Sequence, residues 1–348
     1  MEKKSQLMPL RRLLRIRGMG PALTAFAGLI IIYIAFGIIN PMVFSSNNMM
    51  NLLRSMSKYL LIGIGQSYVL ITGNIDLSIG SVVGMSAMIS ATLMTKGMPI
   101  FPAILITMIC CMSVGVINGF LVGKFKLPPF IATLGTMFVA RGVAYMVNVN
   151  RNTDAIASGI GKASADNIQG FFYYGKTLGV YNTFWIAIIL FAVFFFLLSK
   201  TRTGRHIYAI GSNLYAARLS GVNVEATTTK AYLVSAFCSY IVGLILCAQA
   251  GMGNMEAGMM YEMYGVAAGV IGGVSPLGGT GILLGTLAGS AVWQTLENGL
   301  NMIGAQVGIQ RVVIGVIVVF AVLLDVVLRR GKSFKKSTKN TEKSTLKT

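Results

Sequence analysis

Residues 73–84 read Gly-Asn-Ile-Asp-Leu-Ser-Ile-Gly-Ser-Val-Val-Gly and place a carboxylate, Asp76, between two strongly apolar stretches. An ionisable side chain is costly at bilayer depth, so it usually faces the interior of a helix bundle or a water-filled path rather than lipid. The surrounding glycines predict a broken or tightly packed helix, because such backbone is tolerated at membrane depth only where protein or a cavity surrounds it. Asp76 is therefore the first candidate for a residue on a solute pathway.

The composition is that of a polytopic membrane protein. Of the 348 residues, 55% are hydrophobic and 11% are charged, whereas soluble domains carry about 25% charged residues. A helix needs roughly 20 apolar residues to cross the hydrocarbon, so we predict an all-α protein with about ten transmembrane helices, some of them broken, or about eight with re-entrant pieces. The clearest spans are 21–39, 99–122, 181–199, 231–250 and 309–328, and the shorter or interrupted ones are 59–72, 80–95, 128–148, 262–275 and 277–300.

Positive charge gathers at the two ends of the chain and in one internal segment, giving a formal net charge of +19. An excess of Lys and Arg marks cytoplasmic segments of membrane proteins, so no nucleic-acid partner is needed to explain this charge. We predict three parts. They are a basic cytoplasmic N-terminus (1–20), a single transmembrane domain (21–328) with a cytoplasmic loop at about 200–230, and a basic cytoplasmic tail (329–348).

Motifs for covalent chemistry are missing from the sequence. Gly331-Lys332-Ser333 looks like the end of a phosphate-binding loop, but that loop needs a glycine at position 326, where the chain has Val326. Neither Gly-x-Ser-x-Gly nor His-Glu-x-x-His occurs. We therefore predict that the chain is not an enzyme and holds no metal or cofactor of its own. The cysteines lie in apolar spans without metal-site spacing: Cys110, Cys111, Cys238 and Cys247.

Two regions of the sequence look like imperfect copies of each other. Residues 73–76 lead into Gly-x-x-x-Gly at 80–84, and residues 272–275 lead into Gly-x-x-x-Gly-x-x-x-Gly at 281–289. Duplicated broken helices around a central site are common in transporters. Chance is the alternative, because 41 glycines make such matches easy to find.

Three stretches together resemble the permease subunit of ribose-type carbohydrate ABC importers, and the resemblance spans residues 50–330. The stretches are Gly-Asn-Ile-Asp-Leu-Ser-Ile-Gly-Ser at 73–81, Leu-Pro-Pro-Phe-Ile-Ala-Thr-Leu-Gly-Thr at 127–136, and the segment 204–222, which contains Ala-Ile-Gly-Ser-Asn and Ala-Ala-Arg-Leu-Ser-Gly-Val. The sequence departs from the family pattern at Leu214 and Tyr215, where Pro and a polar residue are common, and at Asn74, which is often Gly.

The resemblance implies the membrane core of an importer in the bacterial inner membrane. Its partners would be a second permease copy, identical or different, a cytoplasmic ATPase that binds ATP and Mg²⁺, and a periplasmic or lipid-anchored sugar-binding protein. We predict import of a monosaccharide, ribose-like or related. The alternatives are a nucleoside or branched-chain amino acid permease of the same superfamily, an ion-coupled carrier in which Asp76 and Glu297 relay protons, and a membrane enzyme, which the missing motifs disfavour.

Within segment 201–230, residues 214–219 are predicted to form a short helix that is capped by Asn213 and ended by Gly221. Such a helix, with small residues and an exposed Arg218, is suited to docking into a cleft of the ATPase. An ordinary connecting loop is the alternative. The candidate coupling residues are Asn213, Ala216, Ala217, Arg218, Ser220 and Gly221.

Polar residues inside predicted spans are the remaining candidates. Gln294, Glu297, Asn298 and Asn301 fall at helical spacing on one face, which must meet water, solute or another helix. For any single residue, bonding between helices is the stronger alternative to solute contact. Arg141 carries the same ambiguity, and Arg311 is suited to reach the membrane surface. The candidate substrate-pathway residues are Asn74, Asp76, Ser78, Asn118, Thr133, Gln294, Glu297 and Asn298.

Overall fold

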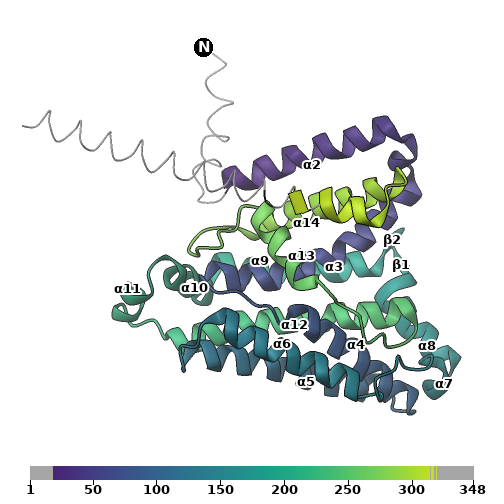
Figure 1. Cartoon of the computed structure of the whole chain (residues 1–348), viewed down its shortest axis with the longest axis horizontal. Helices are drawn as coiled ribbons and strands as arrows, with labels where there is room; N and C mark the ends of the chain where they lie inside the picture. Colours follow the sequence, from purple (N-terminus) through teal and green to yellow (C-terminus); the bar gives the residue numbers. More distant parts are fainter. Residues whose placement is uncertain (1–18, 314, 317–318, 320–348) are drawn as a thin grey trace, which may run out of the picture.

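The computed structural model describes residues 19–313, 315–316 and 319 (Figure 1). Residues 1–18, the tail 329–348 and most of the predicted last span, 309–328, lie outside the described residues. The described chain is almost entirely helical, which confirms the all-α prediction. In order, its elements are α2 (Met19–Ile39), η2 (Pro41–Phe44), α3 (Ser46–Ile71), α4 (Ile79–Thr95), α5 (Ile100–Gly123), α6 (Pro129–Met146), α7 (Ala157–Ile160), α8 (Lys162–Gln169), η3 (Gly170–Tyr174), β1 (Lys176–Thr177), β2 (Val180–Tyr181), α9 (Asn182–Lys200), α10 (Arg202–Ser212), α11 (Leu214–Leu219), α12 (Val224–Ala250), α13 (Tyr261–Ile271) and α14 (Leu283–Met302).

Among the described helices, α2, α5, α6, α9 and α12 are long and apolar enough to cross a membrane, and α4 is a shorter apolar helix. They coincide with predicted spans apart from small shifts at the ends, except that α12 begins well before its predicted start at residue 231. Helices α3 and α14 are long as well but carry more polar residues. Both are packed among other helices, so their polar side chains meet protein rather than lipid.

Three predicted helix boundaries were wrong, because each was placed by apolar content alone. Helix α3 begins before residue 59, since the Ser45 hydroxyl accepts a hydrogen bond from the Asn48 N–H and caps the helix there. Helix α12 begins before residue 231, since the Asn223 side chain caps it in the same way. Helix α14 begins after residue 277, because Gly278 and Gly279 have positive φ angles that an α-helix does not use.

Helix α12 lies at the centre of the bundle and packs against α3, α4 and α5 (Figure 1). Small residues allow these close approaches. A Cβ atom at Gly65 of α3 would lie 2.9 Å from Ser235 Cα of α12, and one at Gly115 of α5 would lie 2.8 Å from Ala236 Cβ. Helices α2 and α14 cover one flank of the central helices, and α5 and α6 cover the opposite flank.

The two ends of the bundle differ in construction (Figure 1). At one end, α10 and α11 project beyond the long helices. At the other end lie α7, α8 and the antiparallel pair β1–β2, in which Lys176 is opposite Tyr181. Arg54 of α3 holds this second end in place, because its guanidinium lies 4.1 Å from the ring centroid of Tyr181 and 4.4 Å from that of Tyr173.

Candidate functional site

The segment between α3 and α4 is a true helix break, and Asp76 is buried inside it, only 2% exposed. The Asp76 carboxylate accepts three hydrogen bonds. Two reach Oδ1, from the Ser78 N–H at 2.9 Å and the Ser78 hydroxyl at 2.6 Å, and one reaches Oδ2, from the Ser235 hydroxyl of α12 at 2.7 Å. The carboxylate therefore fixes the break against α12, as buried charges with full hydrogen bonding do.

A chain of hydrogen bonds extends from Asp76 across α5 to α6. The Asn118 amide donates to the Ser78 hydroxyl at 2.9 Å, and the Thr136 hydroxyl donates to Asn118 Oδ1 at 2.6 Å. The structure thus brings together Asp76, Ser78 and Asn118, three of the predicted pathway residues. Thr136 is a member of this network that the sequence did not single out.

Two other predicted residues are close to this network without sharing its side-chain bonds. The Thr133 hydroxyl donates to the Pro129 carbonyl of its own helix, and only its backbone oxygen accepts from Thr136, at 3.2 Å. The Asn74 amide donates to the Thr72 hydroxyl at 2.8 Å. The Asn74 side chain therefore bonds to the residue that follows α3 and not to the Asp76 network.

A second helix break separates α13 from α14, and its start repeats the hydrogen bonding of the first. In the first break, Gly73 N–H donates to the Leu70 carbonyl and Asn74 N–H to the Val69 carbonyl. In the second, the matching donors are Gly273, to Val270, and Val274, to Gly269. The matching positions are thus Gly73 and Gly273, not Gly272 as the sequence comparison had it.

The second break is longer than the first, which corrects the predicted glycine face. Gly281 lies before α14 in non-helical backbone, whereas Gly285 and Gly289 are within α14. Gly285 packs directly against Gly272, and Gly289 against Ala268, so these glycines bring α14 close to α13.

The two breaks meet each other and the projecting end of the bundle. The Gly279 N–H donates to the Ile71 carbonyl at 2.8 Å. Gly211, near the end of α10, packs against the same Ile71 carbonyl. The Tyr208 hydroxyl of α10 donates to the Gly281 carbonyl at 2.7 Å. Helix α10 is therefore in contact with both breaks at once.

The polar face of α14 is turned toward α3. The amides of Asn298 and Asn48 exchange hydrogen bonds of 2.9 and 3.1 Å, and the Tyr59 hydroxyl donates to Glu297 Oε2 at 2.7 Å. Gln294 is buried, and its side-chain oxygen has no hydrogen-bond partner among the described residues. In this conformation, Glu297 and Asn298 serve contacts between helices, the alternative weighed from the sequence.

A cavity of about 450 Å³ lies near this face, between α3, α4, α12 and the non-helical segment 251–260. Its polar lining is Lys58, Gln249, Asn254, Glu256 and Tyr261. The sequence reasoning missed Lys58, because the predicted helix began one residue later, at 59. The sequence did contain a signal for this residue. If the helix is taken to begin near residue 46, Lys58 is a charged residue inside a long membrane helix.

Arg141 of α6 holds the wall of that cavity. Its guanidinium donates to the carbonyls of Met255 at 3.0 Å, Ala257 at 2.9 Å and Gly80 at 3.1 Å. Irregular backbone inside a membrane protein needs such donors, because lipid offers none. Arg311, by contrast, is exposed.

The predicted coupling helix is present as α11 (Leu214–Leu219). Asn213 Oδ1 accepts from the Ala216 N–H at 2.9 Å, and Gly221 has a φ of 79° after the helix end. The residues of α11 differ in exposure. Ala217 is only 4% exposed and faces this chain, so it offers no surface to a partner. The large apolar side chains of α11 are exposed, namely Leu214, Tyr215 and Leu219, and Arg218 is exposed beside them.

Comparison with known protein families identifies the family of this chain. Residues 48–322 match the model of the branched-chain amino acid transport system / permease component family. The chain belongs to this permease family. The match includes both helix breaks, the cavity and α11, so the candidate site lies within the region that matches the family.

Individual relatives are similar to the permease over most of its length. Ribose import permease protein RbsC of Bacillus subtilis is 36% identical over 93% of this chain and 98% of its own. RbsC of Haemophilus influenzae is 36% identical over 86% of this chain and 92% of its own. D-allose transport system permease protein AlsC of Escherichia coli is 32% identical over 85% and 89%. No solved structure gives a significant match to the permease.

Proposed function

We propose that the permease is the membrane-spanning subunit of an ATP-driven, binding-protein-dependent importer of a monosaccharide. The observation that carries the proposal is the similarity to relatives named for ribose, allose and galactose import, at 32–36% identity. The runner-up is import of a branched-chain amino acid, which the family description names. The sugar is favoured because the named relatives match nearly the whole chain, whereas the family description covers a wider group.

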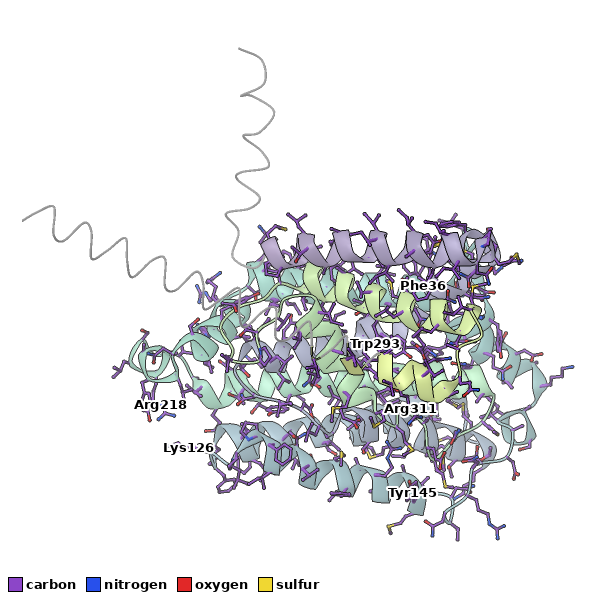
Figure 2. The ribbon with its side chains drawn as sticks, turned by 45° about the horizontal axis from the view of Figure 1, so that its top comes forward. Phe36, Lys126, Tyr145, Arg218, Trp293 and Arg311 are labelled. Atoms are coloured by element: carbon purple, nitrogen blue, oxygen red, sulfur yellow. The ribbon has the colours of Figure 1, made fainter. Side chains whose placement is uncertain are left out.

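The geometry of α11 supports a separate ATPase as the source of energy. Leu219 is 90% exposed and Tyr215 78%, on a short helix that projects from the bundle. Figure 2 shows Arg218 at this tip, with Lys126 at the same end of the molecule. Large apolar side chains that project in this way are typical of protein contacts. In this proposal ATP and Mg²⁺ are bound by the partner, and the permease performs no covalent chemistry.

The contacts of α10 supply a route from the ATPase to the membrane path. When ATP binding in the partner moves α11, α10 moves with it, because the two helices are consecutive and packed together. Tyr208 and Gly211 then transmit the movement to both helix breaks. A rigid contact at two breaks allows a switch between outward and inward access.

The candidate pathway residues take different parts in this scheme. Asp76, Ser78 and Asn118 hold the first break closed, and they meet the solute only when α4, α5 and α12 separate. Thr133 and Asn74 support the ends of their own helices. Gln294, Glu297 and Asn298 lie on the α14 face, where the Gln294 amide oxygen has no hydrogen-bond partner within the described part of the chain. Asn213, Ala216, Ser220 and Gly221 shape α11.

The orientation and assembly complete the proposal. Both termini and α10–α11 are cytoplasmic, following the positive charge of segment 200–230. The end with β1–β2 then faces the sugar-binding protein outside the bacterial inner membrane. Two permease copies, identical or different, form the membrane core.

Deletion of the chain in its own host tests the proposal. Cells that lack it should lose uptake of radiolabelled ribose, allose or galactose, and a plasmid copy should restore that uptake. Uptake of radiolabelled leucine should not change. Loss of leucine uptake with normal uptake of all three sugars would replace the proposal by the runner-up.

A further inference from the structure

The cavity of about 450 Å³ has the size of a small-molecule site. Ligand pockets in proteins have volumes of roughly 300–1,000 Å³. Five of its lining residues carry hydrogen-bonding side chains, and its other residues are small or apolar, among them Ala87 and Leu246.

The lining is chemically matched to a neutral solute with many hydroxyl groups. Lys58 donates to Gln249 Oε1 at 3.2 Å, which occupies one of the three ammonium donors. The Asn254 side chain accepts from the Glu256 N–H at 2.9 Å, which leaves its amide NH₂ group available as a donor. One cationic and one anionic side chain line the cavity, so their formal charges cancel.

An aromatic surface completes the lining. The ring of Tyr261 lies 6.0 Å from that of Tyr59 and 5.6 Å from that of Tyr264, centroid to centroid. Trp293 joins the same cluster, 5.0 Å from Tyr264, and Figure 2 shows it inside the bundle. Polar groups around a firmly packed aromatic side chain offer both hydrogen bonds and an apolar face, which the hydroxyls and C–H groups of a sugar ring can use.

The cavity wall is held in position before any solute arrives. Besides the two bonds from Arg141 to Met255 and Ala257, the non-helical segment is bonded to residues 152–156. The Thr153 hydroxyl accepts from the Gly253 N–H at 2.8 Å, and Asn152 Oδ1 accepts from the Met255 N–H at 3.0 Å. A wall that is already ordered lowers the entropy cost of binding.

We infer that this cavity is a binding site for a neutral polyhydroxylated solute of monosaccharide size within the permease itself. Gln249 and Ala250 lie at the end of α12 away from α10–α11, so the site is on the side that receives solute from outside. The inference rests on the proposed function, because it assigns the solute. A zwitterionic amino acid is the competing occupant, since Lys58 and Glu256 offer a charge of each sign.

The first part of the test measures transport in proteoliposomes. The complete importer is used, and the substrate is the sugar that the wild type takes up. Lys58→Met removes the ammonium, Glu256→Gln removes only a charge, and Ala250→Trp fills the cavity from an exposed position. Each should lower the maximal uptake rate at least about fivefold, a loss of roughly 1 kcal/mol. Lys162→Met and Ala163→Trp, both at exposed positions of α8, are matched controls outside the cavity and its supporting segment and should transport normally.

Protection from labelling is the second part and reports binding without transport. In the complete importer, Ala250→Cys should react with a small maleimide more slowly when the transported sugar is present, and leucine should give no protection. If the wild type takes up the sugar and the Lys58→Met and Ala250→Trp variants transport it at the same rate, the inference is overturned and the proposed function stands. Protection by leucine alone would also overturn it. A wild type that takes up no sugar would refute the proposed function itself. If Lys58→Met fails to fold, the transport measurement uses Glu256→Gln in its place, because that substitution is nearly isosteric.

Discussion

The amide N–H of Gly279 donates a hydrogen bond of 2.8 Å to the carbonyl oxygen of Ile71, so the two helix breaks of the permease are joined by backbone. These residues are far apart in sequence. Ile71 ends α3 just before the first of the two similar regions, and Gly279 lies within the second. Gly211 of α10 packs against the same carbonyl. One backbone oxygen therefore lies where both breaks and the projecting end of the bundle come together.

Gly211→Ala should disturb this junction. The added methyl group would overlap the Ile71 carbonyl and lie 2.5 Å from Gly279 N. We expect uptake to fall. The free energy of unfolding should decrease by about 1–3 kcal/mol, which a lower melting temperature of the purified permease would report. Gly135→Ala in α6 is the matched control, because nothing lies within 4 Å of the new atom. If the Gly211→Ala protein is as stable and active as the control, close packing of Gly211 against Ile71 and Gly279 is not required.

Asp76→Asn should weaken the first break. The carboxylate accepts from three donors, and an amide has only one oxygen, so its NH₂ group would face a donor. We expect a destabilisation of about 1–3 kcal/mol and reduced uptake, while the ATPase still co-purifies. Ser235→Ala removes a single donor and should give a smaller effect. Asp166→Asn, on exposed α8, should change neither property. Normal uptake by Asp76→Asn would remove Asp76 from the mechanism.

On α11, the exposed and buried positions should respond differently. Leu219→Glu places a charge on a side chain that is 90% exposed, so it should reduce co-purification of the ATPase without lowering the permease's own melting temperature. Ala217→Glu buries a charge and should lower that melting temperature. Leu178→Glu, 87% exposed at the opposite end, is the control and should leave ATPase binding intact. Equal ATPase binding by Leu219→Glu and Leu178→Glu would move the docking surface away from α11.

Labelling from outside the cell tests the orientation. The proposed orientation places α7 and α8 outside, at the β1–β2 end. Gly161 lies between these helices, but it has a φ of 80°, which a cysteine tolerates poorly. Its neighbour gives a cleaner test, since Lys162→Cys is exposed at the start of α8. An impermeant maleimide should modify Lys162→Cys in intact cells and should modify Ser212→Cys only after lysis. Labelling of Ser212→Cys in intact cells would invert the topology.

Local features of this fold were readable from the sequence. The Asn213 cap, the length of α11 and the break at Asp76 each depend on residues within a few positions of one another. Ser78 was likewise predicted beside Asp76 because it is two residues away. Asn118 was a weaker candidate, and its contact with Ser78 needed the packing of α5 to become visible.

Features built from distant segments were not readable. The cavity joins Lys58 to Glu256 through a non-helical segment whose path Arg141 fixes, and no periodicity in the sequence encodes that path. The burial of Ala217 was not readable for a similar reason. In a helix as short as α11, the tertiary contacts decide which side is buried, and the composition does not.

Sugar uptake by purified components tests the role of the permease most directly. The permease, the ATPase that co-purifies with it and the sugar-binding protein are reconstituted in liposomes with radiolabelled ribose, allose or galactose outside. We expect accumulation of one of these sugars when ATP and Mg²⁺ are enclosed on the ATPase side, and none when the ATPase or ATP is left out. Accumulation driven by a proton or sodium gradient across liposomes that hold the permease alone would show instead that it is an ion-coupled carrier.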